Sequence, residues 1–119
     1  DGLALINTLL GMVIDIDTQK PKLAGKPGGL SGPAIRPVAV RAIYQVHSAF
    51  RNVPILGMGG VTSGKDALEM IFAGASAVSV GTATFGNPSA AIKVKTELQS
   101  LLQDRGFNSV SEAIGVAHE

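Results

Sequence analysis

The chain has 119 residues, enough for one compact domain with a sizeable core but too few for two full domains. Ten lysines and arginines against nine aspartates and glutamates leave no basic excess for nucleic acid or an anionic membrane surface, and no apolar run approaches the roughly 18 residues of a membrane helix. The absence of cysteine excludes a disulfide framework, a cysteine-ligated metal or iron–sulfur site and a thiol nucleophile within these residues.

The first predicted element is a strand at residues 3–6. Every position in it is apolar, which is typical of a strand buried on both faces of a parallel sheet, and it ends at the polar pair Asn7-Thr8. Because a strand begins this close to the first residue, we expect the chain to be part of a larger protein.

Residues 9–36 form a long connection. Within it, residues 12–17 alternate between apolar and polar side chains and predict a short ribbon. Residues 25–33 are rich in glycine and proline, which argues against both a helix and a central strand. A connection of this length inside a compact domain is more often functional than accidental.

The next element is an amphipathic helix at residues 37–50. Pro37 suits a first helical position, and an apolar stripe with helical spacing follows it: Ala39, Ile43, Val46 and Phe50.

Strands and helices then alternate to the end of the chain. In order, we predict a strand at 53–58, a helix at 65–73, a strand at 77–80, a helix from 88 to near 106 and a short terminal helix after 109. Ser63 and Asp66 have the spacing of a capping box before the helix at 65–73, and Gly74 supplies its C-terminal stop. Asn87 is a candidate cap for the helix at 88, and Ser109 with Glu112 repeats the capping-box pattern.

This order predicts an α/β fold. Alternating helices and all-apolar strands imply parallel pairing through right-handed crossovers. An isolated parallel sheet of three strands would leave both edges unpaired, which makes it a poor independent unit. The pattern fits a part, about three strands, of a (β/α)₈ barrel, whose full length is typically about 250 residues.

Candidate binding residues follow the strands, because the carboxyl ends of barrel strands form the working face. Gly59-Gly60 and Gly81-Thr82 follow successive strands, and Ser31-Gly32 lies in the long connection. Glycines leave backbone N–H groups open to close approach by an anion, and the helix capped by Ser63 could add its positive end. Such glycines can also simply form tight turns, but two pairs at equivalent positions favour a phosphate site.

Asn7 and Thr8 allow two interpretations. An amide next to a hydroxyl at a strand end can read the edge of a planar polar ring. The same side chains can equally cap the strand end by bonding to nearby backbone groups. The residues alone do not decide between these interpretations.

Other polar and methionine side chains are weaker candidates. We predict that His47 and His118 are exposed, and that Asp15 and Asp17 lie on a solvated edge of the ribbon, so no metal site is expected. The methionines are expected to fill the core: Met12, Met58 and Met70.

Four segments, taken together, resemble the C-terminal part of a dihydroorotate dehydrogenase. They are residues 6–8, 28–35, 55–61 and 73–82, and their order and spacing match over about residues 1–86. The run from Ser31 to Pro37 resembles the class 1B catalytic subunit more than the fumarate-using class 1A enzymes or the membrane-associated class 2 enzymes.

The resemblance implies that residues 1–119 are a partial FMN-binding TIM-barrel domain of an enzyme that oxidises dihydroorotate to orotate in pyrimidine biosynthesis. It further implies a cytoplasmic homodimer and a separate partner subunit. The partner subunit would carry FAD and a 2Fe-2S cluster and would pass electrons to NAD. Matched by motif, Asn7 and Thr8 are the expected contacts of the pyrimidine. The expected contacts of FMN are Ile6 and Gly32 and, around its phosphate, Gly59, Gly60, Gly81 and Thr82.

The family's catalytic cysteine base and its flavin-contacting lysine precede the matched segment. No catalytic base is therefore expected in this chain, which by itself should be incomplete and inactive. Two alternatives stay open: the pyrimidine-reducing domain of a dihydropyrimidine dehydrogenase, and a non-catalytic half barrel that binds FMN or phosphate. Gly81-Thr82 and Pro33 favour dihydroorotate over the first alternative.

Overall fold

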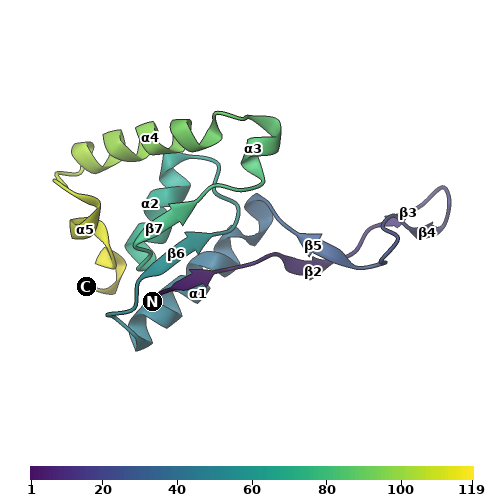
Figure 1. Cartoon of the computed structure of the whole chain (residues 1–119), viewed down its shortest axis with the longest axis horizontal. Helices are drawn as coiled ribbons and strands as arrows, with labels where there is room; N and C mark the ends of the chain where they lie inside the picture. The colour runs from purple at the N-terminus through teal and green to yellow at the C-terminus, as the bar shows by residue number, and fades with distance from the viewer.

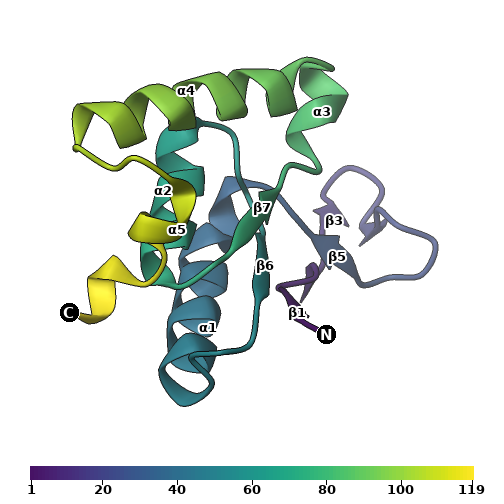
Figure 2. The same cartoon turned by 60° about the vertical axis from the view of Figure 1, so that its left-hand side comes forward.

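The computed structural model describes all of residues 1–119 and contains one parallel sheet of three strands. The strands are β1 (Leu3–Leu5), β6 (Ile55–Met58) and β7 (Ala77–Ser79), in the spatial order β1-β6-β7. Helices α1 (Arg36–Ala49) and α2 (Gly64–Ala73) pack on one face of this sheet (Figure 2), and α4 (Ala90–Asp104) packs on α2. The predicted α/β order with parallel strands is confirmed.

The core lies between the sheet and these helices. Its buried apolar side chains come from α1, β6, α2 and α4 and the loops that join them: Ala39, Ile43, Ile55, Val61, Ala67, Met70, Ala73, Ala75 and Val94. A smaller cluster, Leu68, Ile71, Leu102 and Ala113, joins α2 and α4 to α5 (Val110–Ala113).

The prediction that the first strand is buried on both faces is wrong for this chain. Leu3 is 44% exposed, and Leu56 on the neighbouring strand β6 is 38% exposed, whereas Ile55 is buried. Alternate residues of a strand point to opposite faces, and within this chain only one face of the sheet is covered by helices.

The long connection forms an extended arm of two short antiparallel ribbons (Figure 1). Strand β2 (Leu9–Gly11) pairs with β5 (Gly28–Leu30), and β3 (Ile14–Asp15) pairs with β4 (Lys20–Pro21). A ribbon was expected at residues 12–17, and residues 14–15 do form one of its strands. The other strand is β4, at residues 20–21. A short 3₁₀ turn, η1 (Pro33–Ile35), leads from the arm into α1.

Helix α1 confirms the predicted helix but differs on two side chains. Phe50 follows the helix and is 60% exposed, whereas His47, expected on the surface, is buried with 8% of its area exposed. His47 lies four residues after Ile43 and eight after Ala39, so it continues the buried face. It packs against Gly74 and Gly115, where any added Cβ atom would contact the imidazole ring.

The C-terminal part matches its prediction only in outline. A short helix that was not predicted, α3 (Ala83–Gly86), follows β7. Helix α4 begins at residue 90 instead of 88, and its N-cap is Ser89, not the predicted Asn87, whose Oδ1 accepts a hydrogen bond from Ser89 N–H. The chain ends with α5 and a 3₁₀ turn, η2 (Val116–His118). The prediction that His118 is exposed is wrong, because its ring stacks on Tyr44 and bonds the Ala73 carbonyl at 2.9 Å.

Helices α2 and α4 are in close contact at Gly64. The Gly64 N–H donates to Glu97 Oε2 at 2.7 Å, and a Cβ atom at this position would collide with the backbone of α4 at Leu98. No helix in the structure combines the length and the hydropathy that a membrane span requires.

We predict that Gly64→Ala lowers the free energy of unfolding by about 1–3 kcal/mol, because the added methyl group forces α2 and α4 apart. Gly86→Ala is the matched control, since a Cβ atom there meets no heavy atom within 4 Å. Denaturant unfolding of the protein carrying each substitution measures the effect, and equal midpoints for the two variants would contradict this account of the packing.

Candidate functional site

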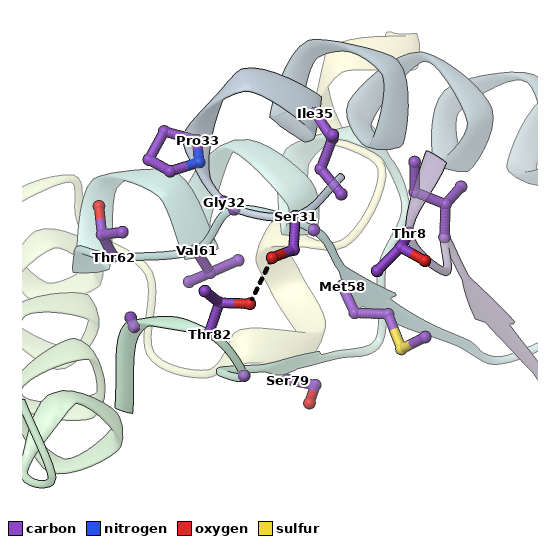
Figure 3. A pocket seen from close by; sticks show the side chains of 15 residues that line it. Thr8, Ser31, Gly32, Pro33, Ile35, Met58, Val61, Thr62, Ser79 and Thr82 are labelled. Atoms are coloured by element: carbon purple, nitrogen blue, oxygen red, sulfur yellow. Dashed lines mark hydrogen bonds between the residues drawn. The ribbon is translucent and has the colours of Figure 1, made fainter. Parts of the chain in front are cut away.

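A cavity of about 260 Å³ lies at the carboxyl ends of the three parallel strands (Figure 3). Parallel strands end at the same edge of the sheet, so the segments that follow β1, β6 and β7 meet there, and the loop before α1 closes one side. All but one of the predicted site residues line the cavity: Ile6, Thr8, Gly32, Gly59, Gly60, Gly81 and Thr82.

Asn7 is the predicted residue that the cavity does not include. Its side chain is exposed, and Asn7 Oδ1 accepts a hydrogen bond from Thr8 N–H at 2.7 Å. This contact corresponds to the strand-end capping interpretation, although the amide nitrogen Nδ2 remains available as a donor.

Several lining residues were not predicted from the sequence. Ser31, a candidate through the Ser31-Gly32 pair, also lines the cavity, whereas Met58, expected in the core, is half-buried at the cavity wall. The others are Pro33, Ile35, Val61, Thr62, Ser79 and Ala83. Each of these six lies within three positions of a predicted site residue in sequence, so proximity to those residues was the available signal.

Two glycines shape the loop that follows β6. Gly59 and Gly60 have φ values of +129° and +71°, a backbone region that other residues rarely adopt. A Cβ atom on Gly60 would lie 2.5 Å from Gly32 O and 2.8 Å from Pro33 Cα. Glycine therefore lets this loop lie directly against the segment that precedes α1.

The backbone N–H groups at this edge are free to bind a ligand. No backbone carbonyl of the chain accepts a hydrogen bond from the N–H of Gly59, Gly60, Val61, Gly81 or Thr82. Unpaired N–H groups gathered around a concave site are suited to an anion such as phosphate. None of the lining residues carries a charged side chain, so the part of the cavity formed by this chain offers neutral donors only.

The N-terminus of α2 does not contribute to this donor set, which corrects the sequence-based expectation. Asp66 Oδ2 accepts from the N–H groups of Thr62 and Ser63 at 3.0 and 3.1 Å, while Glu97 Oε2 binds the Gly64 N–H. The predicted capping box with Ser63 is present, with Asp66 N–H donating to Ser63 Oγ. Carboxylates of the chain itself therefore occupy the positive end of this helix.

Asp66 is ionised because of its bonding partners. Partial burial raises its pKa, but hydrogen bonds from Thr62 and Ser63 and the nearby Arg36 guanidinium outweigh burial and hold the pKa of Asp66 below its ordinary value of 3.8. A neutral contact ties another part of the cavity wall, where Thr82 Oγ1 donates to Ser31 Oγ at 2.9 Å (Figure 3). This bond joins the end of β7 to the loop that precedes α1.

A model of the family described as "Dihydroorotate dehydrogenase" matches residues 1–102 of the chain. The chain belongs to the dihydroorotate dehydrogenase family. Members of this family are flavin-dependent oxidoreductases.

Curated relatives agree with this family assignment. Proteins named "Dihydroorotate dehydrogenase B (NAD(+)), catalytic subunit" from Desulforamulus reducens and Oceanobacillus iheyensis are 52% and 53% identical over 99% and 96% of the chain. A relative from Aquifex aeolicus, provisionally named as the A (fumarate) type, is 53% identical over 99% of the chain. The chain spans only 37–39% of the length of these three dihydroorotate dehydrogenases.

Solved structures give the same answer for the fold. Two crystal structures of the dihydroorotate dehydrogenase of Eimeria tenella, one in complex with ferulenol and one ligand-free, superpose with a TM-score of 0.83 at 32% identity. They cover 100% of this chain, which corresponds to 31% and 33% of theirs. The parallel sheet is thus a part of the TIM barrel of this family.

We predict that Asp66→Asn lowers the free energy of unfolding by about 1–3 kcal/mol at neutral pH, because an amide cannot replace the charge-assisted bonds of the carboxylate. Since the pKa of folded Asp66 lies below its ordinary value of 3.8, the stability it contributes is fully present above that value and is lost as the pH falls below it. The difference between wild type and variant should therefore shrink on acidification.

Unfolding measured between neutral pH and pH 3 tests this prediction, with Asp104→Asn at the exposed end of α4 as control. A difference that stays constant down to pH 3 would show that the Asp66 charge has no role in the loop.

Proposed function

We propose that the protein takes part in the FMN-dependent oxidation of dihydroorotate to orotate in pyrimidine biosynthesis, and that residues 1–119 form the part of its TIM-barrel domain that holds the FMN phosphate and one side of the pyrimidine. The observation that carries this proposal is the cavity at the ends of β1, β6 and β7, lined by unpaired N–H groups in a chain of this family.

The residues present fit the phosphate end of FMN. The N–H groups of Gly59, Gly60, Gly81 and Thr82 are unpaired donors beside one cavity, and the Thr82 hydroxyl lies among them. With a volume of about 260 Å³, the cavity has room for part of such a ligand and not for the whole of it. Ile6 and Gly32 supply an apolar wall and close backbone approach for the adjoining part of the cofactor.

When bound, the flavin ring supplies the redox chemistry, taking two electrons from dihydroorotate and releasing them to an acceptor. The residues of this chain bind and orient the cofactor and the substrate. In our proposal the Thr8 hydroxyl and the Asn7 amide contact polar atoms at one edge of the pyrimidine. Asn7 can do this with Nδ2 while its Oδ1 keeps the bond to Thr8 N–H.

The cavity has no side chain suited to removing the substrate proton. Its polar lining groups are hydroxyls and backbone amides, which are poor bases near neutral pH. We therefore assign this chain no catalytic residue and propose that the base comes from a segment that precedes the matched region, where the family resemblance places a cysteine.

The names of the relatives extend the proposal to partners. "Catalytic subunit" in the B (NAD(+)) relatives denotes an enzyme with a further subunit. For this protein we propose an electron-transfer subunit carrying FAD and a 2Fe-2S cluster, NAD as final acceptor and a homodimer of the full-length chain. We also propose a cytoplasmic location, with neither nucleic acid nor membrane as a partner.

The two alternatives differ in support. The family match and the relatives compared above carry dihydroorotate names, so a pyrimidine reductase of the dihydropyrimidine dehydrogenase type is not favoured. A non-catalytic half barrel that binds FMN or phosphate is the second candidate, because the cavity lacks an acid or base side chain.

We expect the full-length protein to contain FMN and its visible flavin absorption to bleach on anaerobic addition of dihydroorotate. Retention of FMN without bleaching would support the non-catalytic candidate, and bleaching by dihydrouracil in place of dihydroorotate would support the pyrimidine reductase. A colourless protein that does not take up added FMN would contradict the proposal as a whole.

We predict that Gly60→Ala weakens FMN binding by at least tenfold, because the added methyl group meets Gly32 O and Pro33 Cα and pushes the loop after β6 out of place. Gly106→Ala is the matched control, since Gly106 also has a positive φ, +78°, but its Cβ position is open.

Fluorescence titration of the full-length apoprotein with FMN measures the effect. Both substitutions should lower stability through backbone strain, and only Gly60→Ala should change the Kd for FMN. Equal FMN affinity in the two variants would argue against a role of the loop in binding.

A further inference from the structure

Arg36 lies directly behind the loop that follows β6. It is the first residue of α1, immediately after the turn η1 that lines the cavity, yet its own side chain points to the outer surface beside Asp66 and Glu69. The guanidinium bonds Asp66 Oδ1 at 3.1 Å and Glu69 Oε2 at 3.3 Å, and Nη1 also contacts Gly60 O at 3.5 Å.

Asp66 connects Arg36 to the end of the same loop. One carboxylate oxygen, Oδ1, binds Arg36, while the other, Oδ2, accepts from the Thr62 hydroxyl at 2.9 Å and from the N–H groups of Thr62 and Ser63. The loop is thus held from behind at two places, at the Gly60 carbonyl by Arg36 and at residues 62–63 by Asp66.

The Gly60 carbonyl orientation determines where the next N–H points. In a trans peptide the carbonyl of one residue and the N–H of the next are antiparallel. Because Gly60 O faces Arg36 on the outer side, Val61 N–H points away from Arg36, and Val61 itself lines the cavity. No backbone carbonyl accepts a hydrogen bond from Val61 N–H.

We propose that Arg36 is a positioning residue for the phosphate of FMN: it anchors the Gly60 carbonyl from outside the cavity, and so directs the Val61 N–H toward the ligand and holds the loop of residues 59–61 in place. It touches neither cofactor nor substrate and acts only through the loop. This inference rests on the proposed function, because it takes FMN to be the ligand of the cavity.

The test compares two ligands that differ only in the phosphate. Full-length apoprotein is titrated with FMN and with riboflavin, for the wild type, Arg36→Ala and the control Arg41→Ala. Arg41 is an exposed arginine on the same helix whose guanidinium bonds only Gln45.

We expect Arg36→Ala to weaken FMN binding roughly tenfold, about the effect of one charge-assisted contact, with riboflavin binding unchanged. Arg41→Ala should change neither affinity. If Arg36 only joined α1 to α2, its loss would lower the unfolding temperature. The affinities for FMN and riboflavin would then fall by the same factor or stay unchanged.

Arg36→Lys keeps the test decisive if the alanine variant does not fold. A lysine ammonium has a single nitrogen in place of Nε and Nη1, the two atoms with which Arg36 holds Glu69, Asp66 and Gly60 O, so FMN should again lose affinity relative to riboflavin. If both Arg36 variants keep the wild-type preference for FMN over riboflavin, the inference about Arg36 is wrong, while the proposed phosphate site stands. If the wild-type protein binds FMN and riboflavin equally well, both the proposed phosphate site and the inference about Arg36 are contradicted.

Discussion

Parallel hydrogen bonding of β1, β6 and β7 is the constraint on which the site depends. The register places Leu5 beside Gly57 and Met58 beside Ser79, so the three strands end within a few residues of one another. The residues that follow each strand converge on one cavity, although the outermost of them, Ile6 and Ala83, lie 77 positions apart in sequence. The hydrophobic core beneath, with Ile43 and Ile55 fully buried, fixes the helices and hence the loops between strand and helix.

Charged side chains lie outside this cavity, and neutral groups line it. The carboxylates of Asp66 and Glu97 satisfy the N-terminus of α2, and Arg36 balances Asp66 on the outer surface. The cavity itself is lined by neutral groups with unpaired N–H donors. Within this chain, binding of an anion must therefore rely on the short loops after β6 and β7, and a phosphate close to the start of α2 would meet two negative side chains.

The sequence was sufficient to predict those features that depend on local pattern. Strand and helix order, the Ser63 and Asp66 capping box and the cluster of strand-end glycines follow from periodicity and residue type over a few positions. What it could not show depends on contacts between distant segments. His47 is buried because Gly74 and Gly115 leave space for its ring, and Glu97 reaches the start of α2 only after α4 has packed on it. The arm between β1 and α1 was predicted only in part, because its two ribbons form from strands of only two or three residues, too short to show an alternating pattern.

The central claim is that the N–H groups after β6 and β7 hold the phosphate of a flavin. A crystal structure of the full-length protein with FMN bound tests it most directly. The claim predicts phosphate oxygens about 3 Å from backbone nitrogens of residues 59–61 and 81–82, with Asp66 and Glu97 still bonded to the N-terminus of α2. A phosphate that instead displaces those carboxylates, or that lies outside the cavity formed by β1, β6 and β7, would contradict it.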